Sequence, residues 1–265
     1  SLSTNTTCSA NVAIGHCALK SSSSGTFNVA IGNHALKTLT TTDRNVAIGA
    51  SALCTTTTGT GNTAIGFESL CANTTADNNV AVGCFGLKAN TDGTGNTSVG
   101  TSALTANTTA SNNTAVGYQS LLTNTVGFNN VGFGNQSLCL LTNGDYNTAI
   151  GQGSMAKTTE GNRNVAVGNN ALICNTTGTA NTAVGGTNSG TLPVMWKNTT
   201  GQCNSAFGTT ALASNTTGGC NVAVGLCAGC GNTTGSSNTA VGGTAGRQIT
   251  TGGNNTSIGR ESGLV

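Results

Sequence analysis

Charged and aromatic side chains are scarce in this chain of 265 residues, at 6 % and 3 %, and there is a single proline. An average soluble domain is about 25 % charged. Nine basic and seven acidic residues leave a net charge of only +2, too little to keep a disordered tail in solution. No basic block offers a surface for phosphate, and no apolar run approaches the roughly 18 residues that span a bilayer. We therefore expect no nucleic-acid partner and no membrane insertion.

Small residues dominate instead, since 40 Gly, 49 Thr and 35 Asn make up 47 % of the chain. They recur with a period of 17, in units that begin with Asn-(Val/Thr)-Ala-(Ile/Val)-Gly. The period holds from Asn11 to Asn181, is lengthened by six residues in the coil 181–203, and holds again from Asn204 to Asn255. Below, this Asn is position 1 of each unit. Fifteen copies cover the chain, which predicts one repeat domain over residues 1–265.

A period of 17 is too short for a helix pair and suits one coil of a parallel β-solenoid, so the sequence predicts an all-β fold of about fifteen coils. Stacking at about 4.8 Å would align identical residues into ladders. We expect the Asn of position 1 to form an amide ladder and the Gly of position 5 to adopt a positive φ. The Asn-Thr-Thr-Gly at positions 12 to 15 predicts a second short strand ending in a turn.

Both sides of the first strand are constrained, because position 3 is nearly always Ala and position 4 is always Ile, Val or Phe. Adjacent residues of a strand point to opposite faces. Either the Ala lies inside a thin coil and the aliphatic side chain lines an outer interface, or the reverse holds. A self-association surface and a monomer with a merely flat Ala face are both compatible with this pattern.

The segments 11–15 (Asn-Val-Ala-Ile-Gly) and 147–151 (Asn-Thr-Ala-Ile-Gly) resemble the head repeats of trimeric autotransporter adhesins. The full unit of 17 residues is similar to repeats of phage and viral tail fibres. The resemblance implies trimeric, left-handed parallel β-rolls that serve as spacers, stalks or adhesive heads. We therefore expect a structural fibre, filament or adhesin, extracellular or on a cell or virion surface, that associates laterally, head to tail, or both. Its partners would be copies of itself, surface glycans or a host receptor.

Eleven cysteines point to an oxidising setting, and the odd number leaves at least one thiol free or bonded to another chain. Two pairs share a repeat position in adjacent coils, which places their Cα atoms about 4.8 Å apart, within disulfide range. These predicted bonds are Cys54 with Cys71 and Cys203 with Cys220. Cys227 and Cys230 are candidates for a local pair. A zinc site made of Cys203, Cys220, Cys227 and Cys230 is the alternative.

Seven Asn-x-(Ser/Thr) sequons share position 12 and are candidates for glycosylation, although such sequons are inevitable in a repeat rich in Asn and Thr and glycans on adjacent coils would collide. They begin at Asn5, Asn73, Asn107, Asn175, Asn198, Asn215 and Asn232.

The insertion around residues 190–197 holds the only Pro and the only Trp. Pro193, Met195 and Trp196 are either a contact loop for a partner or a bulge that packs on its own solenoid.

No catalytic constellation is visible, since His16 and His34 occupy different repeat positions and the carboxylates are scattered. We expect no enzyme, cofactor or metal site.

Two alternatives to a structural fibre stay open. One is ice binding through the Thr ladder of position 13, although near-invariance there is also typical of a Thr that stabilises a turn. The other is a receptor-binding or glycan-binding fibre module.

Overall fold

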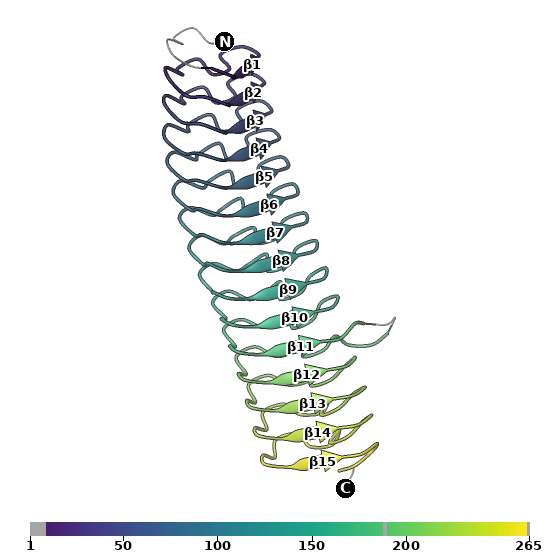
Figure 1. The fold of residues 1–265 in the computed structure, drawn as a ribbon. Coiled ribbons are helices and arrows are strands. Elements are labelled where there is room, and N and C mark those ends of the chain that lie inside the picture. The colour runs from purple at the N-terminus through teal and green to yellow at the C-terminus, as the bar shows by residue number, and fades with distance from the viewer. Residues whose placement is uncertain (1–8, 188–189, 264–265) are drawn as a thin grey trace. The chain divides into compact units, whose positions relative to one another are not determined.

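The computed structural model describes residues 9–187 and 190–263. The described chain is all-β and contains no helix: each coil contributes one strand of three residues, and these strands pair in parallel. This confirms the predicted β-solenoid with coils of about 17 residues (Figure 1). By contacts the chain divides into two compact units, Ser1–Asn129 and Asn130–Val265. That the chain forms a single domain stays a prediction.

The strands of the N-terminal unit pair in sequence order and in register, with Ala30 opposite Ala47 and Ala47 opposite Ala64. They are β1 (Val12–Ile14), β2 (Val29–Ile31), β3 (Val46–Ile48), β4 (Thr63–Ile65), β5 (Val80–Val82), β6 (Thr97–Val99) and β7 (Thr114–Val116).

The strands of the C-terminal unit follow the same rule, and the insertion does not disturb it, since Ala183 lies opposite Ala206. They are β8 (Val131–Phe133), β9 (Thr148–Ile150), β10 (Val165–Val167), β11 (Thr182–Val184), β12 (Ser205–Phe207), β13 (Val222–Val224), β14 (Thr239–Val241) and β15 (Thr256–Ile258).

The Gly of position 5 ends each strand, as predicted, with a positive φ. Gly151 has φ 125°, and a Cβ built on it would lie 2.5 Å from the carbonyl oxygen of Gly168 in the next coil. The backbones of the two coils therefore come close together at the point that a side chain would occupy, and only Gly fits there. Gly185, in the coil with the insertion, is the exception among the described residues, because it lacks the positive φ.

The Asn of position 1 forms the predicted amide ladder. The backbone N–H of Asn164 donates to Oδ1 of Asn147 in the preceding coil at 3.0 Å. Its own Nδ2 donates to the carbonyl of Gly178 at 2.9 Å, which closes the coil on itself. Each amide thus satisfies backbone groups of two coils, and Asn164 is fully buried.

The Asn of position 12 forms a second ladder beside the first. Nδ2 of Asn215 donates to Oδ1 of Asn198 at 2.8 Å and to the carbonyl of Gly218 at 2.9 Å. The same carbonyl accepts Nδ2 of the position-1 residue Asn204 at 2.8 Å. The ladder stops where the next coil lacks Asn: Asn232 Oδ1 is buried without a partner, and the following coil has Ile249 at this position.

The segment of positions 12 to 15 is not a strand, which corrects the sequence-based expectation: the described coils have bends there. The side chains supply the order instead. The Thr of position 13 donates its hydroxyl to the carbonyl of its counterpart one coil on, as from Thr199 to Thr216 at 3.1 Å and from Thr216 to Thr233 at 2.9 Å.

Small and aliphatic side chains fill the rest of the interior, from positions 3, 8 and 9. Leu53 and Leu104 of position 9 are fully buried and have φ values of 48° and 50°. Positions 7 and 17 also adopt the left-handed conformation with residues other than Gly, such as Glu68 and Arg44. For an L-residue this conformation costs about 1–2 kcal/mol, so it persists because the inter-coil hydrogen bonds fix it on both sides.

Candidate functional site

The outer face of the sheet repeats the same types of side chain from coil to coil in each unit. In β9, Ala149 is fully buried while Thr148 is half-buried and Ile150 is 41 % exposed. The same alternation holds in the other strands, so the Ala of position 3 points inward and positions 2 and 4 point outward. This decides between the two orientations that the sequence left open. The outer sheet face, defined here as positions 2 and 4 of every strand, is built from Val, Thr, Ser, Ile and Phe.

No charged residue occurs at positions 2 and 4 of any coil. The charged side chains lie on the turns instead, as in the ion pair between Lys88 and Glu68 at 2.8 Å. The side chains of position 4 reach substantial exposure, with Ile14 at 59 % and Phe133 at 54 %. A sheet face in contact with solvent tolerates Lys and Glu. Burial within the chain therefore does not explain why both are absent from positions 2 and 4.

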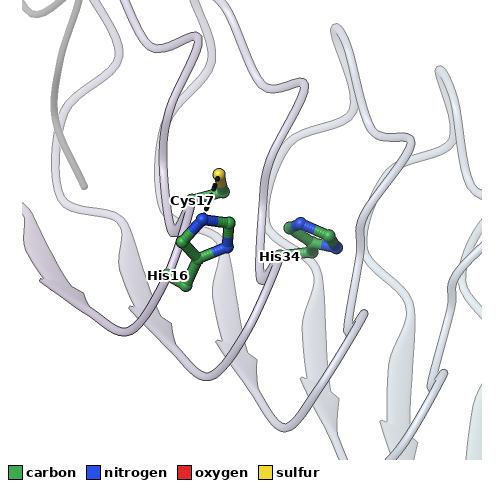
Figure 2. Close-up of side chains that lie close together, drawn as sticks. All are labelled: His16, Cys17 and His34. Atoms are coloured by element: carbon green, nitrogen blue, oxygen red, sulfur yellow. Dashed lines mark hydrogen bonds between the residues drawn. The ribbon is translucent and has the colours of Figure 1, made fainter.

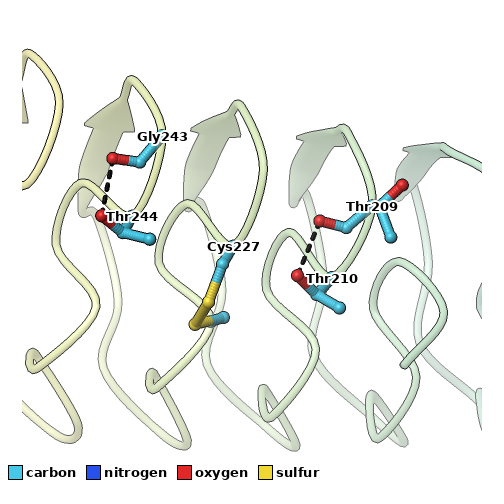
Figure 3. The surroundings of a disulfide bond; sticks show 6 residues. Thr209, Thr210, Cys227, Gly243 and Thr244 are labelled. Atoms are coloured by element: carbon cyan, nitrogen blue, oxygen red, sulfur yellow. Dashed lines mark hydrogen bonds between the residues drawn. A yellow bond between two sulfur atoms is a disulfide. The ribbon is translucent and has the colours of Figure 1, made fainter. Parts of the chain in front are cut away.

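The cysteines match the predictions in one of three pairs. Cys227 and Cys230 form a disulfide with an S–S distance of 2.09 Å. Figure 3 shows this bond in one turn, between the corresponding turns of Thr210 and Thr244, whose hydroxyls donate to the carbonyls of Thr209 and Gly243 at 2.7 and 2.8 Å. The bond therefore braces the turn after β13 where the neighbouring coils use a threonine hydroxyl.

The other two predicted disulfides are not formed. Cys203 and Cys220 are free and exposed, and Cys54 and Cys71 are free thiols whose sulfur atoms lie 2.8 Å apart. The equal repeat position that suggested these bonds thus brings the thiols of Cys54 and Cys71 together without a bond between them.

A hydrogen bond from the Cys71 thiol lowers the pKa of Cys54 to about 7, and the same contact together with burial raises the pKa of Cys71. The alternative zinc site does not fit, because Cys227 and Cys230 are bonded to each other. Cys8 lies outside the described residues.

The predicted glycosylation sites are contradicted by burial wherever the structure describes them. Their amide nitrogens, which would carry the glycan, donate to carbonyls inside the coil, as Asn73 does to Ala76 at 3.1 Å. A glycan on such a nitrogen is incompatible with this packing. Asn5 lies outside the described residues; the buried six are Asn73, Asn107, Asn175, Asn198, Asn215 and Asn232.

Of the three candidate residues of the insertion, two lie in the interior, which favours the bulge that packs on its own solenoid over a contact loop. Pro193 and Met195 are buried, and Met195 occupies the interior place of the Leu of position 9, with φ 48°. Trp196 is half-buried and lies under the Lys197 ammonium at 5.9 Å. The extra residues thus precede Val194, and the exposed part of this loop includes Leu192 (Figure 1).

The Thr ladder of position 13 is engaged within the solenoid, because its hydroxyls donate to carbonyls of the next coil. This favours the turn-stabilising role over a role on an ice-binding face.

A shallow pocket of about 360 Å³ lies elsewhere on the C-terminal unit, lined by Asp145, Tyr146, Asn162, Arg163, Thr179 and Ala180. It offers an aromatic ring and both signs of charge.

None of the described segments forms a helix that could cross a membrane. No family model, curated protein or solved structure matches the chain. The resemblance to adhesin and tail-fibre repeats therefore rests on the repeat residues themselves, and function has to be argued from the outer sheet face.

Proposed function

We propose that this protein is a structural β-solenoid that associates with further copies of itself through the outer sheet face, as an extracellular or surface-exposed fibre element. The observation that carries the proposal is an exposed aliphatic face without a single charge in any coil. Burying such side chains contributes about 25 cal/mol per Å² of apolar surface.

The size of the face suits association. From the strand spacing and rise, three-residue strands give roughly 340 Å² for the N-terminal unit and roughly 380 Å² for the C-terminal unit. Contiguous apolar patches of about 300–600 Å² are the largest on typical monomers and are often functional. Either unit alone therefore presents a face whose area lies within the range of surface patches that are often functional.

A second copy of the chain is the partner that this face fits best. The rows of Val, Ile and Thr repeat at the strand spacing of about 4.8 Å, and an identical face repeats at the same spacing, so the two can interdigitate along their length, as paired sheets do in dry zippers. A partner with another period would lose register within a few coils. The resemblance to trimeric head repeats supports the same partner.

Sedimentation velocity under reducing conditions tests the proposal. Lysine on the outer sheet face, in the double variant Thr97→Lys/Thr148→Lys, would bury two charges in the interface without disturbing the fold, because both side chains point outward. The control Thr109→Lys/Thr177→Lys adds the same charge at position 14, which is exposed and carries Asp92 and Glu160 in other coils.

We expect wild type and control to sediment as multiples of the 25.8 kDa chain and the face variant to sediment as a monomer. A wild-type protein that is monomeric at about 100 μM, well above the micromolar Kd of weak specific complexes, would refute the proposal. Equal association of the two double variants would also refute it.

A further inference from the structure

The two histidines of the chain, the only ones it has, come together with a cysteine at the start of the N-terminal unit. The candidate ligand atoms of His16, Cys17 and His34 all lie within 4.8 Å of one another. Figure 2 shows the three side chains on two successive turns, with the imidazole of His16 between the Cys17 thiol and the ring of His34. Among the described residues this is the one such group of three or more.

The backbone holds these residues in place. Cys17 and His34 both occupy position 7, in the left-handed conformation with φ 56° and 60°. The N–H of His34 donates to the carbonyl of His16 at 2.9 Å, which locks the two turns together. His16, at position 6, sits next to Cys17 in sequence. The spacing of the side chains is therefore set by the ladder and costs little entropy to maintain.

The distances match a tetrahedral metal centre. Nε2 of His16 and Sγ of Cys17 lie 3.6 Å apart. A tetrahedral cation with nitrogen at about 2.0–2.1 Å and sulfur at about 2.3 Å also separates these atoms by about 3.6 Å. The imidazole of His34 lies beside that of His16, with ring centroids 5.6 Å apart and an interplanar angle of 51°. The candidate ligand nitrogen of this half-buried side chain lies within 4.8 Å of the ligand atoms of His16 and Cys17.

We propose that His16, Cys17 and His34 bind a divalent transition-metal cation of the zinc type. Imidazole and thiolate suit Zn²⁺ and Co²⁺, while Mg²⁺ and Ca²⁺ prefer oxygen ligands. Three protein ligands leave the fourth position to water or to a group from another molecule. The bound cation ties the turns of the first two described coils to each other. This inference is independent of the self-association proposed above.

Cobalt titration of the reduced, metal-free protein at neutral pH tests the site, because a thiolate ligand gives Co²⁺ a charge-transfer band and tetrahedral geometry gives strong visible bands. The variants Cys17→Ser, His34→Ser and His16→Asn each remove one ligand. They install residues that the repeat already uses at these positions, Ser51 and Ser102 at position 7 and Asn33 at position 6. Cys84→Ser removes a half-buried thiol elsewhere and is the control.

We expect wild type and Cys84→Ser to bind one more Co²⁺ per chain than the three ligand variants, with Zn²⁺ displacing it. Loss of a ligand should weaken binding at least about 100-fold, beyond the 10–100-fold that loss of a supporting residue causes.

Hydrogen exchange gives a second measurement that needs no cobalt. Zn²⁺ should slow amide exchange in residues 15–36 of the wild type and leave His34→Ser unchanged, since only the intact site links the two turns. Equal Co²⁺ stoichiometry and spectra in wild type and all three ligand variants would overturn the proposal. A protection by Zn²⁺ that persists in His34→Ser would also overturn it. Matching thermal unfolding of the metal-free proteins would show that the variants fold.

Discussion

The two sides of the coil depart from the usual distribution of polar and apolar groups, because amide ladders are buried beside the Ala and Leu of the interior. Inside, Asn164 is fully buried with its amide bonded to two coils, whereas Ile150 on the outer sheet face is 41 % exposed. Globular cores bury aliphatic side chains and leave amides outside. The inner side is thus fixed by the demands of stacking, and the outer side keeps an apolar character that stacking does not require. The inner side therefore reports what the fold needs, and the outer side reports what the proposed association would use.

The turns form a third region with rules of its own. Positions 6, 7 and 10 accept His, Cys, Phe, Glu, Lys and Gln, and the left-handed φ of position 7 changes little with the side chain, from 50° at Glu68 to 60° at His34. The side chain of position 6 can stack on that of position 7 one coil on, as Phe67 and Phe85 do with ring centroids 5.5 Å apart. Chemistry such as the His16, Cys17 and His34 group can therefore arise here without any cost to the coil.

Breaking the inner side where the backbones of two coils approach closely should have the largest effect. In Gly151→Ala the new Cβ would meet the Gly168 carbonyl oxygen at 2.5 Å, at a φ of 125° that L-residues avoid. We expect the free energy of unfolding to fall by roughly 3 kcal/mol or more, measured by urea denaturation. Gly243→Ala is the control, because a Cβ there has no atom within 4 Å. Equal stability of the two variants would contradict this account of the close coil-to-coil approach.

Neighbouring residues of β9 compare the two sides directly. Ala149→Val adds two methyl groups to a fully buried position and should lower the free energy of unfolding by about 1–3 kcal/mol. Ile150→Val removes one methylene from the outer sheet face and should change it by less than about 0.5 kcal/mol in the dissociated chain. Thermal unfolding at low protein concentration measures both, and a larger loss from Ile150→Val would reverse the assignment of inner and outer faces.

The smallest expected effect concerns the half-buried position 10, where the reactivity of a cysteine thiol changes and the stability of the fold does not. The thiolate is the reactive form of cysteine. With its pKa lowered to about 7 by the Cys71 thiol, Cys54 is half ionised at pH 7, and its alkylation rate should rise through a midpoint near that pH. An ordinary thiol with a pKa near 8.5 is only about 3 % ionised there.

Cys139 occupies the same repeat position, but burial raises the pKa of its thiol. It should therefore react with iodoacetamide only at clearly higher pH than Cys54. Cys71→Ala should move the Cys54 midpoint upward by removing the hydrogen bond. The rates are measured by mass spectrometry of the peptides that contain each cysteine. Identical pH profiles for Cys54 and Cys139 would show that the 2.8 Å contact between Cys54 and Cys71 does not control reactivity.

Much of the fold could be predicted from the sequence because the stacking is periodic. A 17-residue period with invariant Asn and Gly predicts parallel coils, the amide ladder and the positive φ of Gly151, and the structure has all three. The left-handed Leu104 could not be predicted in this way, since local preference opposes it and only the hydrogen bonds of neighbouring coils impose it.

The candidate sites were less predictable, because they depend on where side chains point. Equal repeat position brought Cys54 and Cys71 close, yet they are not bonded, and the sequon at Asn73 gave no sign that its amide is buried. Sequence reasoning missed the group of His16, Cys17 and His34, because it considered only residues that share one repeat position. The signal that would reveal this group is the presence of metal-ligating residues at neighbouring repeat positions, here 6 and 7, of adjacent coils.

Photo-cross-linking from the outer sheet face tests the central claim most directly. With p-benzoylphenylalanine replacing Thr148 in one sample and the position-14 residue Thr177 in another, irradiation captures whatever lies against each site. We expect cross-linked dimers and trimers from Thr148 alone, with the captured peptides carrying positions 2 and 4 of a second copy. No cross-linked product from Thr148, or equal yields from Thr148 and Thr177, would contradict the claim that this face is where the chains meet.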